Sequence, residues 1–216
     1  MFRSKFNLRN VVAIAICLVG ATTLSGCDKE EKEPPKDPLT YDEGVVINDV
    51  KWATRNVAAP STFAAKPEDA GMFYQWNRKV AWPTTGDVTN WDNSYPAGDR
   101  WEKSNDPSPA GWRLPYLGEI QKLLDTEKVT NEWVTVNGVN GRKFTDKATG
   151  NSIFLPAVGA RLNDGTLDNK GGIYWSGSQF AGFVHFLVLL DDDTFLNLFN
   201  CGSFGISVRC VVEQEQ

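Results

Sequence analysis

The stretch FVHFLVLLDDDTFLNLFNCGSFGISVRCVV, residues 183–212, decides the fold. Phe183–Leu190 is almost continuously apolar, as expected for a strand that is covered on both faces. Side chains alternate between two faces in Phe195–Phe199 and in Ile206–Val212, where Ile206, Val208, Cys210 and Val212 lie on one side; this predicts two more strands. Asp191–Asp193 would turn the chain between the first two strands. The C-terminal third therefore predicts a core built on a sheet.

Outward from this stretch, shorter strands joined by turns are predicted. Val45–Ile47 and Val50–Ala53 flank Asn48-Asp49, a pair typical of β-hairpin turns. A second pair of strands is predicted on either side of Asn137-Gly138, and Ser152–Leu155 follows as a further strand. Most strands are therefore expected to pair with a neighbour in the sequence.

One segment has the spacing of a helix. Apolar residues recur at helical intervals over 117–124, Pro115 precedes them, and Glu119 lies in the first turn. A second short helix is an alternative for residues 66–74, although Gly71 disfavours it. Without an internal repeat or a second linker, the sequence predicts one loop-rich α+β domain over residues 44–213.

The N-terminus has the composition of an export signal. Three basic residues and no acid occupy the first ten positions, an apolar run follows over residues 11–21, and small residues precede Cys27. The run is shorter than the roughly 20 residues that span a bilayer. Residues 1–26 are therefore predicted to be a signal peptide, with a retained signal anchor as the alternative.

The end of this segment, Leu24-Ser25-Gly26-Cys27, resembles the bacterial lipobox. The resemblance implies that Cys27 receives a diacylglyceryl group, that the chain is cut before it, and that the new amine is acylated, for example with palmitate. Two or more acyl chains hold a protein on a membrane where one binds only marginally. Cys27 is thus predicted to be a lipid anchor.

Residues 27–43 are predicted to form an acidic, flexible tether. Residues 28–43 contain seven acids and three prolines and almost no apolar side chain. An acidic stretch after the lipidated Cys resembles the surface-export signal of Bacteroidota-type lipoproteins, which implies display on the outer membrane; a plain solvated spacer has the same composition. Loss of residues 1–26, with their three positive charges, shifts the formal net charge from −5 to −8. That charge argues against nucleic acid as a partner.

Several phrases, in this order, resemble the Fibrobacter succinogenes major paralogous domain. They are DPSPAGWRLP at 106–115, FLPA at 154–157, GAR at 159–161, IYWS at 173–176 and GISVRCV at 205–211. The resemblance spans residues 44–212 and implies a C-type-lectin-like fold of loop-rich antiparallel sheets with one or two short helices.

The chain departs from this family at two positions. A Thr usually caps the helix, and Tyr116 at that position predicts a frayed helix start. A Cys often stands in the family where this chain has Ser108, so Cys210 lacks the partner that the resemblance implies. Either Cys201 pairs with Cys210 or Cys210 is a buried free thiol.

The sequence contains no catalytic constellation and predicts neither a metal nor a cofactor. His185 is the only histidine and lies in an apolar strand, whereas a zinc site needs several ligands. Asp191–Asp193 could attract Ca²⁺, but three adjacent acids cannot all face one ion, so a solvated turn is favoured. The sugar-binding tripeptides of C-type lectins are absent. The sequence therefore argues against an enzyme.

The remaining candidate site is aromatic. Trp91, Tyr95 and Trp101 lie in a long polar loop, where they could bind a ligand or pin the loop to the domain. We therefore expect a surface-displayed lipoprotein with a non-catalytic domain that binds a glycan or a protein. The alternative is a structural or tip-like accessory subunit of an envelope or fimbrial assembly.

Overall fold

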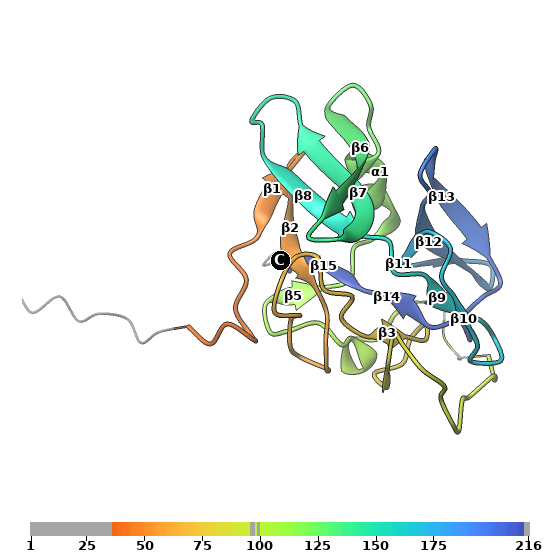
Figure 1. Ribbon diagram of the computed structural model, residues 1–216. Helices are drawn as coiled ribbons and strands as arrows, with labels where there is room; N and C mark the ends of the chain where they lie inside the picture. The colour runs from red at the N-terminus through yellow and green to blue at the C-terminus, as the bar shows by residue number, and fades with distance from the viewer. Residues whose placement is uncertain (1–35, 96–97, 99, 214–216) are drawn as a thin grey trace, which may run out of the picture. The chain divides into compact units, whose positions relative to one another are not determined.

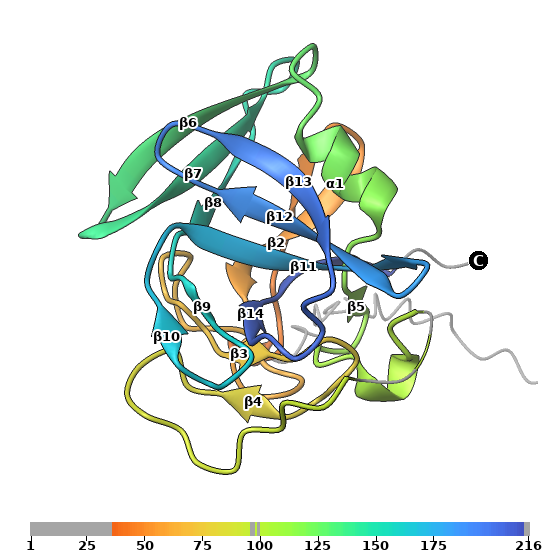
Figure 2. The ribbon, with the colours of Figure 1, turned by 90° about the vertical axis from the view of Figure 1, so that its right-hand side faces the viewer.

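The predicted C-terminal strands belong to the six-stranded sheet and to one smaller sheet beside it (Figures 1 and 2). The computed structural model describes residues 36–95, 98 and 100–213. One sheet has six strands, in the order β13 (Thr194–Phe199), β12 (Phe183–Leu189), β11 (Gly172–Phe180), β14 (Ile206–Ser207), β3 (Phe73–Tyr74) and β4 (Ala81–Trp82). Its pairs are antiparallel except β11 with β14.

Three smaller sheets surround this one. The first has the order β1 (Val45–Ile47), β2 (Val50–Asn56), β15 (Arg209–Val212) and β5 (Trp112–Arg113). The second consists of β6 (Val129–Val136), β7 (Val139–Asp146) and β8 (Ser152–Pro156), and the third of β9 (Ala160–Arg161) and β10 (Leu167–Asp168). The helices are η1 (Lys103–Asn105), a 3₁₀ turn, and α1 (Leu117–Leu123).

The six-stranded sheet buries apolar side chains on both faces, as its sequence predicts. Trp175 and Phe186 belong to one apolar cluster, and their neighbours Tyr174 and Leu187 belong to the other. Successive side chains of a strand point to opposite faces, which explains this division. Figure 2 shows the β6–β7–β8 sheet and α1 on one side of β11–β13, and β3 and β4 on the other.

Both predicted hairpins are confirmed. β1 and β2 are joined by Asn48-Asp49, with φ angles of 45° and 62°, and β6 and β7 by Asn137-Gly138, with 48° and 84°. Two successive positive φ angles define the tight turn whose twist matches that of paired strands. Asp191–Asp193 also forms the turn between β12 and β13, as predicted.

The predicted fold class is wrong. Strand residues make up 42% of the described residues and helical residues 6%, so the domain is mainly β rather than α+β. Several two-residue strands, such as β3, β5 and β10, leave no periodic pattern in the sequence, which is why the prediction missed them. The alternative helix at residues 66–74 is also absent: a Cβ at Gly71, where φ is +70°, would lie 2.3 Å from the Val57 carbonyl oxygen.

The start of α1 is held rather than frayed, so that prediction is wrong too. Tyr116 gives no side-chain cap, but its backbone N–H donates to Glu119 Oε2 at 2.7 Å. The next N–H, of Leu117, donates to Ser178 Oγ at 3.0 Å. Arg113 fixes Glu119 with two hydrogen bonds of 2.7 and 2.8 Å. A distant serine therefore satisfies a helix N–H that a local cap would otherwise bind.

Residues before the predicted boundary at Gly44 also pack against the domain. Asp42 is buried and accepts hydrogen bonds from Thr54 and Arg55 of β2, and the Leu39 carbonyl accepts from Phe63. The last residues of the predicted tether thus pack against the domain. Asp42, one acid of an acidic stretch, forms an ion pair with Arg55, and composition alone does not predict such a contact.

Candidate functional site

The structure separates the three aromatic residues predicted to bind a ligand. Trp91 packs on Trp82 at 4.8 Å between ring centroids, and its indole N–H donates to the Asn163 carbonyl at 3.1 Å. A Cβ at Gly205 would lie 2.8 Å from this indole, so glycine is needed for the ring to approach. Trp91 therefore pins the loop to the domain.

Trp101 and Tyr95 have similar structural roles. The Trp101 ring lies between Trp76 and Trp175, at 5.8 and 6.3 Å, and its N–H donates to the Asn105 carbonyl. Tyr95 is 49% exposed, and its hydroxyl accepts a hydrogen bond from the Gly202 N–H. Because neither tryptophan is mostly exposed and they contact different rings, the three residues do not form one binding surface.

Both remaining cysteines are buried free thiols. Of the two alternatives for Cys210, the structure has the buried free thiol and not the disulfide with Cys201, and Cys210 Sγ donates to Ser108 Oγ at 3.1 Å. Burial raises the pKa of Cys201 to about 12 and that of Cys210 further, so both thiols stay protonated and unreactive at neutral pH. The neighbour of Cys210 is thus the serine at the position where the resembling family has a cysteine.

The other residues weighed for chemistry have structural roles. His185 is partly buried on β12, with Nδ1 3.3 Å from the Ser178 carbonyl oxygen. Asp191–Asp193 is a solvated turn. Within residues 36–95, 98 and 100–213, no three His, Cys, Asp or Glu side chains are grouped so that they could hold a metal ion.

Two buried arginines were missed by sequence reasoning. Arg161 donates to the carbonyls of Pro83, Thr85, Gly86 and Gly165, and Arg209 to Asn56 Oδ1 and the carbonyls of Ala53 and Phe154. Burial lowers the pKa of each guanidinium. Five donors in a rigid fork allow one side chain to join several backbone segments. Both arginines lie in phrases that carry the family resemblance, GAR at 159–161 and GISVRCV at 205–211.

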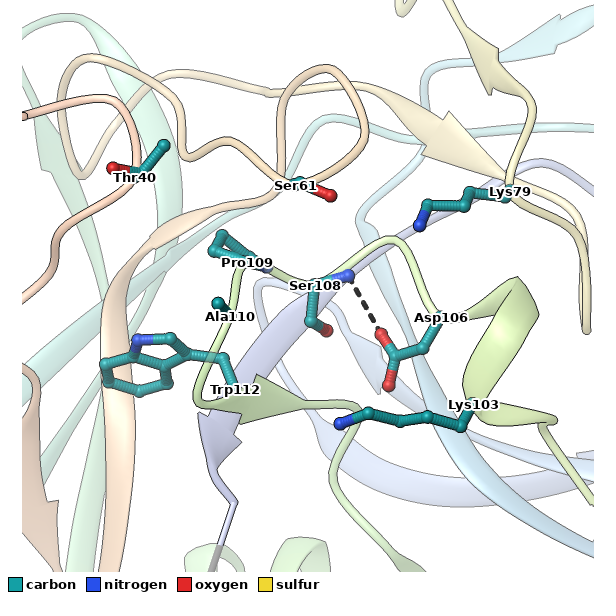
Figure 3. Close-up of a pocket in the computed structure, with 9 residues that line it drawn as sticks. All are labelled: Thr40, Ser61, Lys79, Lys103, Asp106, Ser108, Pro109, Ala110 and Trp112. Atoms are coloured by element: carbon teal, nitrogen blue, oxygen red, sulfur yellow. Dashed lines mark hydrogen bonds between the residues drawn. The ribbon is translucent and has the colours of Figure 1, made fainter.

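A first pocket, the lysine pocket, lies beside the segment that precedes β5 (Figure 3). Its volume is about 410 Å³, and it combines two lysines, hydroxyl groups and an apolar wall. Its lining residues are Thr40, Ser61, Lys79, Lys103, Asp106, Ser108, Pro109, Ala110 and Trp112.

A second pocket, the Trp133 pocket, lies between the β6–β7–β8 sheet and two turns of the chain around β11 and β12. Its volume is about 390 Å³, and it combines one indole with amide and charged side chains. Its lining residues are Trp133, Asn140, Ala157, Asn169, Lys170, Gly171, Leu190 and Asp191.

The walls of the Trp133 pocket are held by backbone register and by a buried cation. Trp133 lies opposite Arg142 in the β6–β7 pair. Arg142 is 7% exposed; its guanidinium lies 5.9 Å from the Trp133 ring centre and donates to the Leu190 carbonyl at 2.8 Å. This bond ties the small sheet to the β12–β13 turn. Arg142 therefore connects the two walls of the pocket.

The polar groups of this pocket have unused hydrogen-bonding capacity. The Trp133 indole N–H and the side chains of Asn169, Lys170 and Asp191 make no hydrogen bond or ion pair with another described residue. Asn140 Oδ1 accepts from the Thr135 hydroxyl at 2.6 Å, which leaves its NH₂ group available. No local sequence pattern predicts this site, because residues 133, 169 and 191 are brought together only by the packing of distant segments.

Comparisons with protein families, with curated proteins and with solved structures found no match for this chain. No helix among the described residues is long and apolar enough to cross a membrane. The predicted signal peptide, residues 1–26, and the predicted lipid anchor at Cys27 lie outside the described residues. The export and family assignments therefore stay predictions from the sequence.

Proposed function

We propose that this protein is an outer-membrane lipoprotein, displayed at the cell surface, whose non-catalytic domain binds a glycan in the Trp133 pocket. The observation that carries the proposal is the combination of one indole face with amide, ammonium and carboxylate groups that have no partner among the described residues. A sugar ring offers an apolar face to stack on an aromatic ring and hydroxyl groups that need both donors and acceptors.

The remainder of the proposal comes from the N-terminal sequence. Lipidation of Cys27 would hold the protein on the membrane, and the acidic residues that follow favour display on the outer surface. The contact between Ser108 and Cys210 supports the family resemblance, since it pairs the two positions at which the family resemblance implies a disulfide. Mass spectrometry of the native protein tests the anchor; a free thiol at Cys27 or a retained signal peptide would refute it.

A glycan array with the detergent-purified full chain tests the binding site. Trp133→Ala and Asp191→Asn are each expected to weaken binding about tenfold or more, as loss of a central contact does in other interfaces. Asp191 is exposed, so its change leaves the packing intact and separates loss of binding from loss of folding. Tyr116→Ala removes another exposed aromatic ring, 53% exposed, and serves as the control. Unchanged binding by Trp133→Ala and Asp191→Asn would refute the site.

One observation favours the structural alternative as a second candidate. The hairpin tip, defined as Phe180, Phe183, Leu198 and Phe199, is exposed, with Phe180 69% and Phe199 57% accessible. These residues are neighbours, because Phe180 pairs with Phe183 and Phe199 with Val184. β13 is also an edge strand with no further partner among the described residues. Exposed apolar groups beside a free edge are typical of assembly surfaces. Self-association abolished by Phe180→Ser/Phe183→Ser would favour this role.

A further inference from the structure

β13 forms an outer edge of the six-stranded sheet and is unprotected there. No strand of the described part lies beyond it, and Figure 1 shows it at the outside of the fold. Its sequence, TFLNLF, has no charged residue and no proline, and its register with β12 has no bulge. Exposure rises along the strand to 39% at Leu198 and 57% at Phe199. Proteins usually protect such edges with lysine, proline or a bulge, because an exposed apolar edge pairs with other chains.

The backbone groups of three β13 residues point away from the sheet. The Leu190 N–H donates to the Asp193 carbonyl at 2.8 Å, so these two residues form a hydrogen-bonded pair. Hydrogen-bonded and non-hydrogen-bonded pairs alternate along an antiparallel ladder. The residues at alternate positions after Asp193, which are Thr194, Leu196 and Leu198, therefore direct their N–H and C=O groups outward.

Neighbouring side chains bind two of the three outward N–H groups. The Thr194 N–H donates to Asp193 Oδ1 at 2.7 Å, and the Leu198 N–H donates to Asn197 Oδ1 at 2.8 Å. These bonds join residues that are adjacent in the chain, so backbone bonds to another strand can replace them without uncovering apolar surface. The Leu196 N–H lies between them and faces a side where no described strand can accept it. A pairing strand would therefore be centred on Leu196.

The charge distribution favours a second copy of this chain as the pairing strand. The chain has a net charge of −5, so two copies repel each other over much of their surface. Between Lys170 and Arg209, however, the sequence has no Asp, Glu, Lys or Arg except Asp191–Asp193. Two acidic copies can therefore meet along β13 itself without placing like charges in contact.

We propose that two copies of the chain pair through β13, antiparallel and about a two-fold axis at Leu196, so that their six-stranded sheets become one. Thr194 then lies opposite Leu198 of the second copy, so the outward backbone groups of both strands meet. Asp193 lies opposite Phe199, which separates the two Asp193 residues by about 20 Å along the pair, at roughly 3.4 Å per residue.

This separation explains the direction of the pair. About 20 Å exceeds the Debye length of about 8 Å at physiological ionic strength, so the acidic turns are screened from each other. A parallel pair would instead place the two Asp191–Asp193 turns side by side. A two-fold contact is also the commonest arrangement of identical chains. The inference depends neither on the lipid anchor nor on glycan binding in the Trp133 pocket.

Sedimentation of the full chain in density-matched detergent tests the inference. We expect a concentration-dependent equilibrium between monomer and dimer. Leu198→Glu should raise the dissociation constant about tenfold or more, because it places a carboxylate beside the acidic turn of the second copy. Val46→Glu makes the same change at a position 44% exposed on β1, an edge strand of another sheet, and should leave the equilibrium unchanged.

Disulfide trapping tests the position of the axis. Leu196→Cys would place two thiols opposite each other, with Cα atoms about 5.5 Å apart, a distance that a disulfide spans. Cys201 and Cys210 are buried, so mild oxidation should join two chains at residue 196, which peptide mapping identifies. Val46→Cys is the matched control and should not join two chains.

Four results would each overturn the proposal. They are a wild type that stays monomeric, an unchanged dimer in Leu198→Glu, a Leu196→Cys variant that dimerises without a bond between the two residues 196, and a dimer that Phe180→Ser/Phe183→Ser abolishes. The last variant changes the hairpin tip outside β13 and leaves the proposed pairing intact, so it separates edge pairing from assembly through the hairpin tip.

Discussion

Ser108→Cys is expected to form a disulfide with Cys210. The Ser108 Oγ and Cys210 Sγ atoms lie 3.1 Å apart in a direct hydrogen bond, so two sulfurs at these positions need only a small shift to reach the S–S bond length of about 2.05 Å. Positions 108 and 210 enclose about 100 residues, and closing a loop of that length restricts the unfolded chain by about 4.7 kcal/mol in the chain-entropy model.

The hydrogen bond that the change removes offsets part of this gain. A hydrogen bond contributes about 1 kcal/mol net to folding stability, so the disulfide should stabilise the variant by about 3 to 4 kcal/mol. For the compact unit of Lys36–Gln216, an unfolding entropy of about 2.1 cal/mol/K per residue gives roughly 0.4 kcal/mol/K. The oxidised variant should therefore unfold about 8 to 10 °C above the wild type.

Thermal unfolding with and without reductant measures this difference. The variant should be oxidised during refolding, because the buried Cys210 thiol has a raised pKa and reacts slowly in the folded state. Ser108→Ala, which loses the hydroxyl and gains no thiol, is the matched control and should be slightly less stable than wild type. The reasoning is refuted if peptide mapping finds both thiols free or a bond to Cys201, or if reduction leaves the midpoint unchanged.

Two further changes test the packing and electrostatics. Gly141→Ala places a Cβ 2.3 Å from the Leu155 carbonyl oxygen, and the β7–β8 pair should lose about 1 to 3 kcal/mol in denaturant unfolding; equal stability would refute the close approach. Burial alone would raise the pKa of Asp42, but hydrogen bonds from Thr54, Gly44 and Arg55 lower it overall. The stabilisation by Asp42 is therefore present above the unfolded pKa of about 3.9 and is lost as the pH falls through the lower folded pKa. In denaturant unfolding measured at several pH values, Asp42→Asn should therefore reduce the loss of stability at acid pH.

Local signals predicted the structure where a few neighbouring residues determine it. Asn137-Gly138 specifies its hairpin through positive φ angles, and the spacing over 117–124 specifies α1. The start of α1 could not be predicted, because Ser178, which binds the Leu117 N–H, is distant in the sequence. The mainly β character was missed for the same reason: a two-residue strand such as β3 exists only through its neighbours β14 and β4.

The aromatic residues that the sequence predicts as a site and those of the proposed Trp133 pocket are different. Large aromatic residues in a polar loop suggested a binding surface, yet Trp91 and Trp101 turn inward because a long loop needs anchors. Trp133, whose pocket has the free polar groups, lies in an ordinary alternating strand. Its exposure depends on which face the neighbouring turns leave open, and no pattern within β6 contains that information.

The last two strands of the chain, β14 and β15, are inner strands of their sheets. β14 lies between β11 and β3, and β15 between β2 and β5, so two sheets share one short C-terminal segment. A polypeptide that emerges N-terminus first, from a ribosome or through a pore, must therefore remain open until residue 212 has appeared. A truncation that removed residues 206–212 would leave both sheets without one of their inner strands.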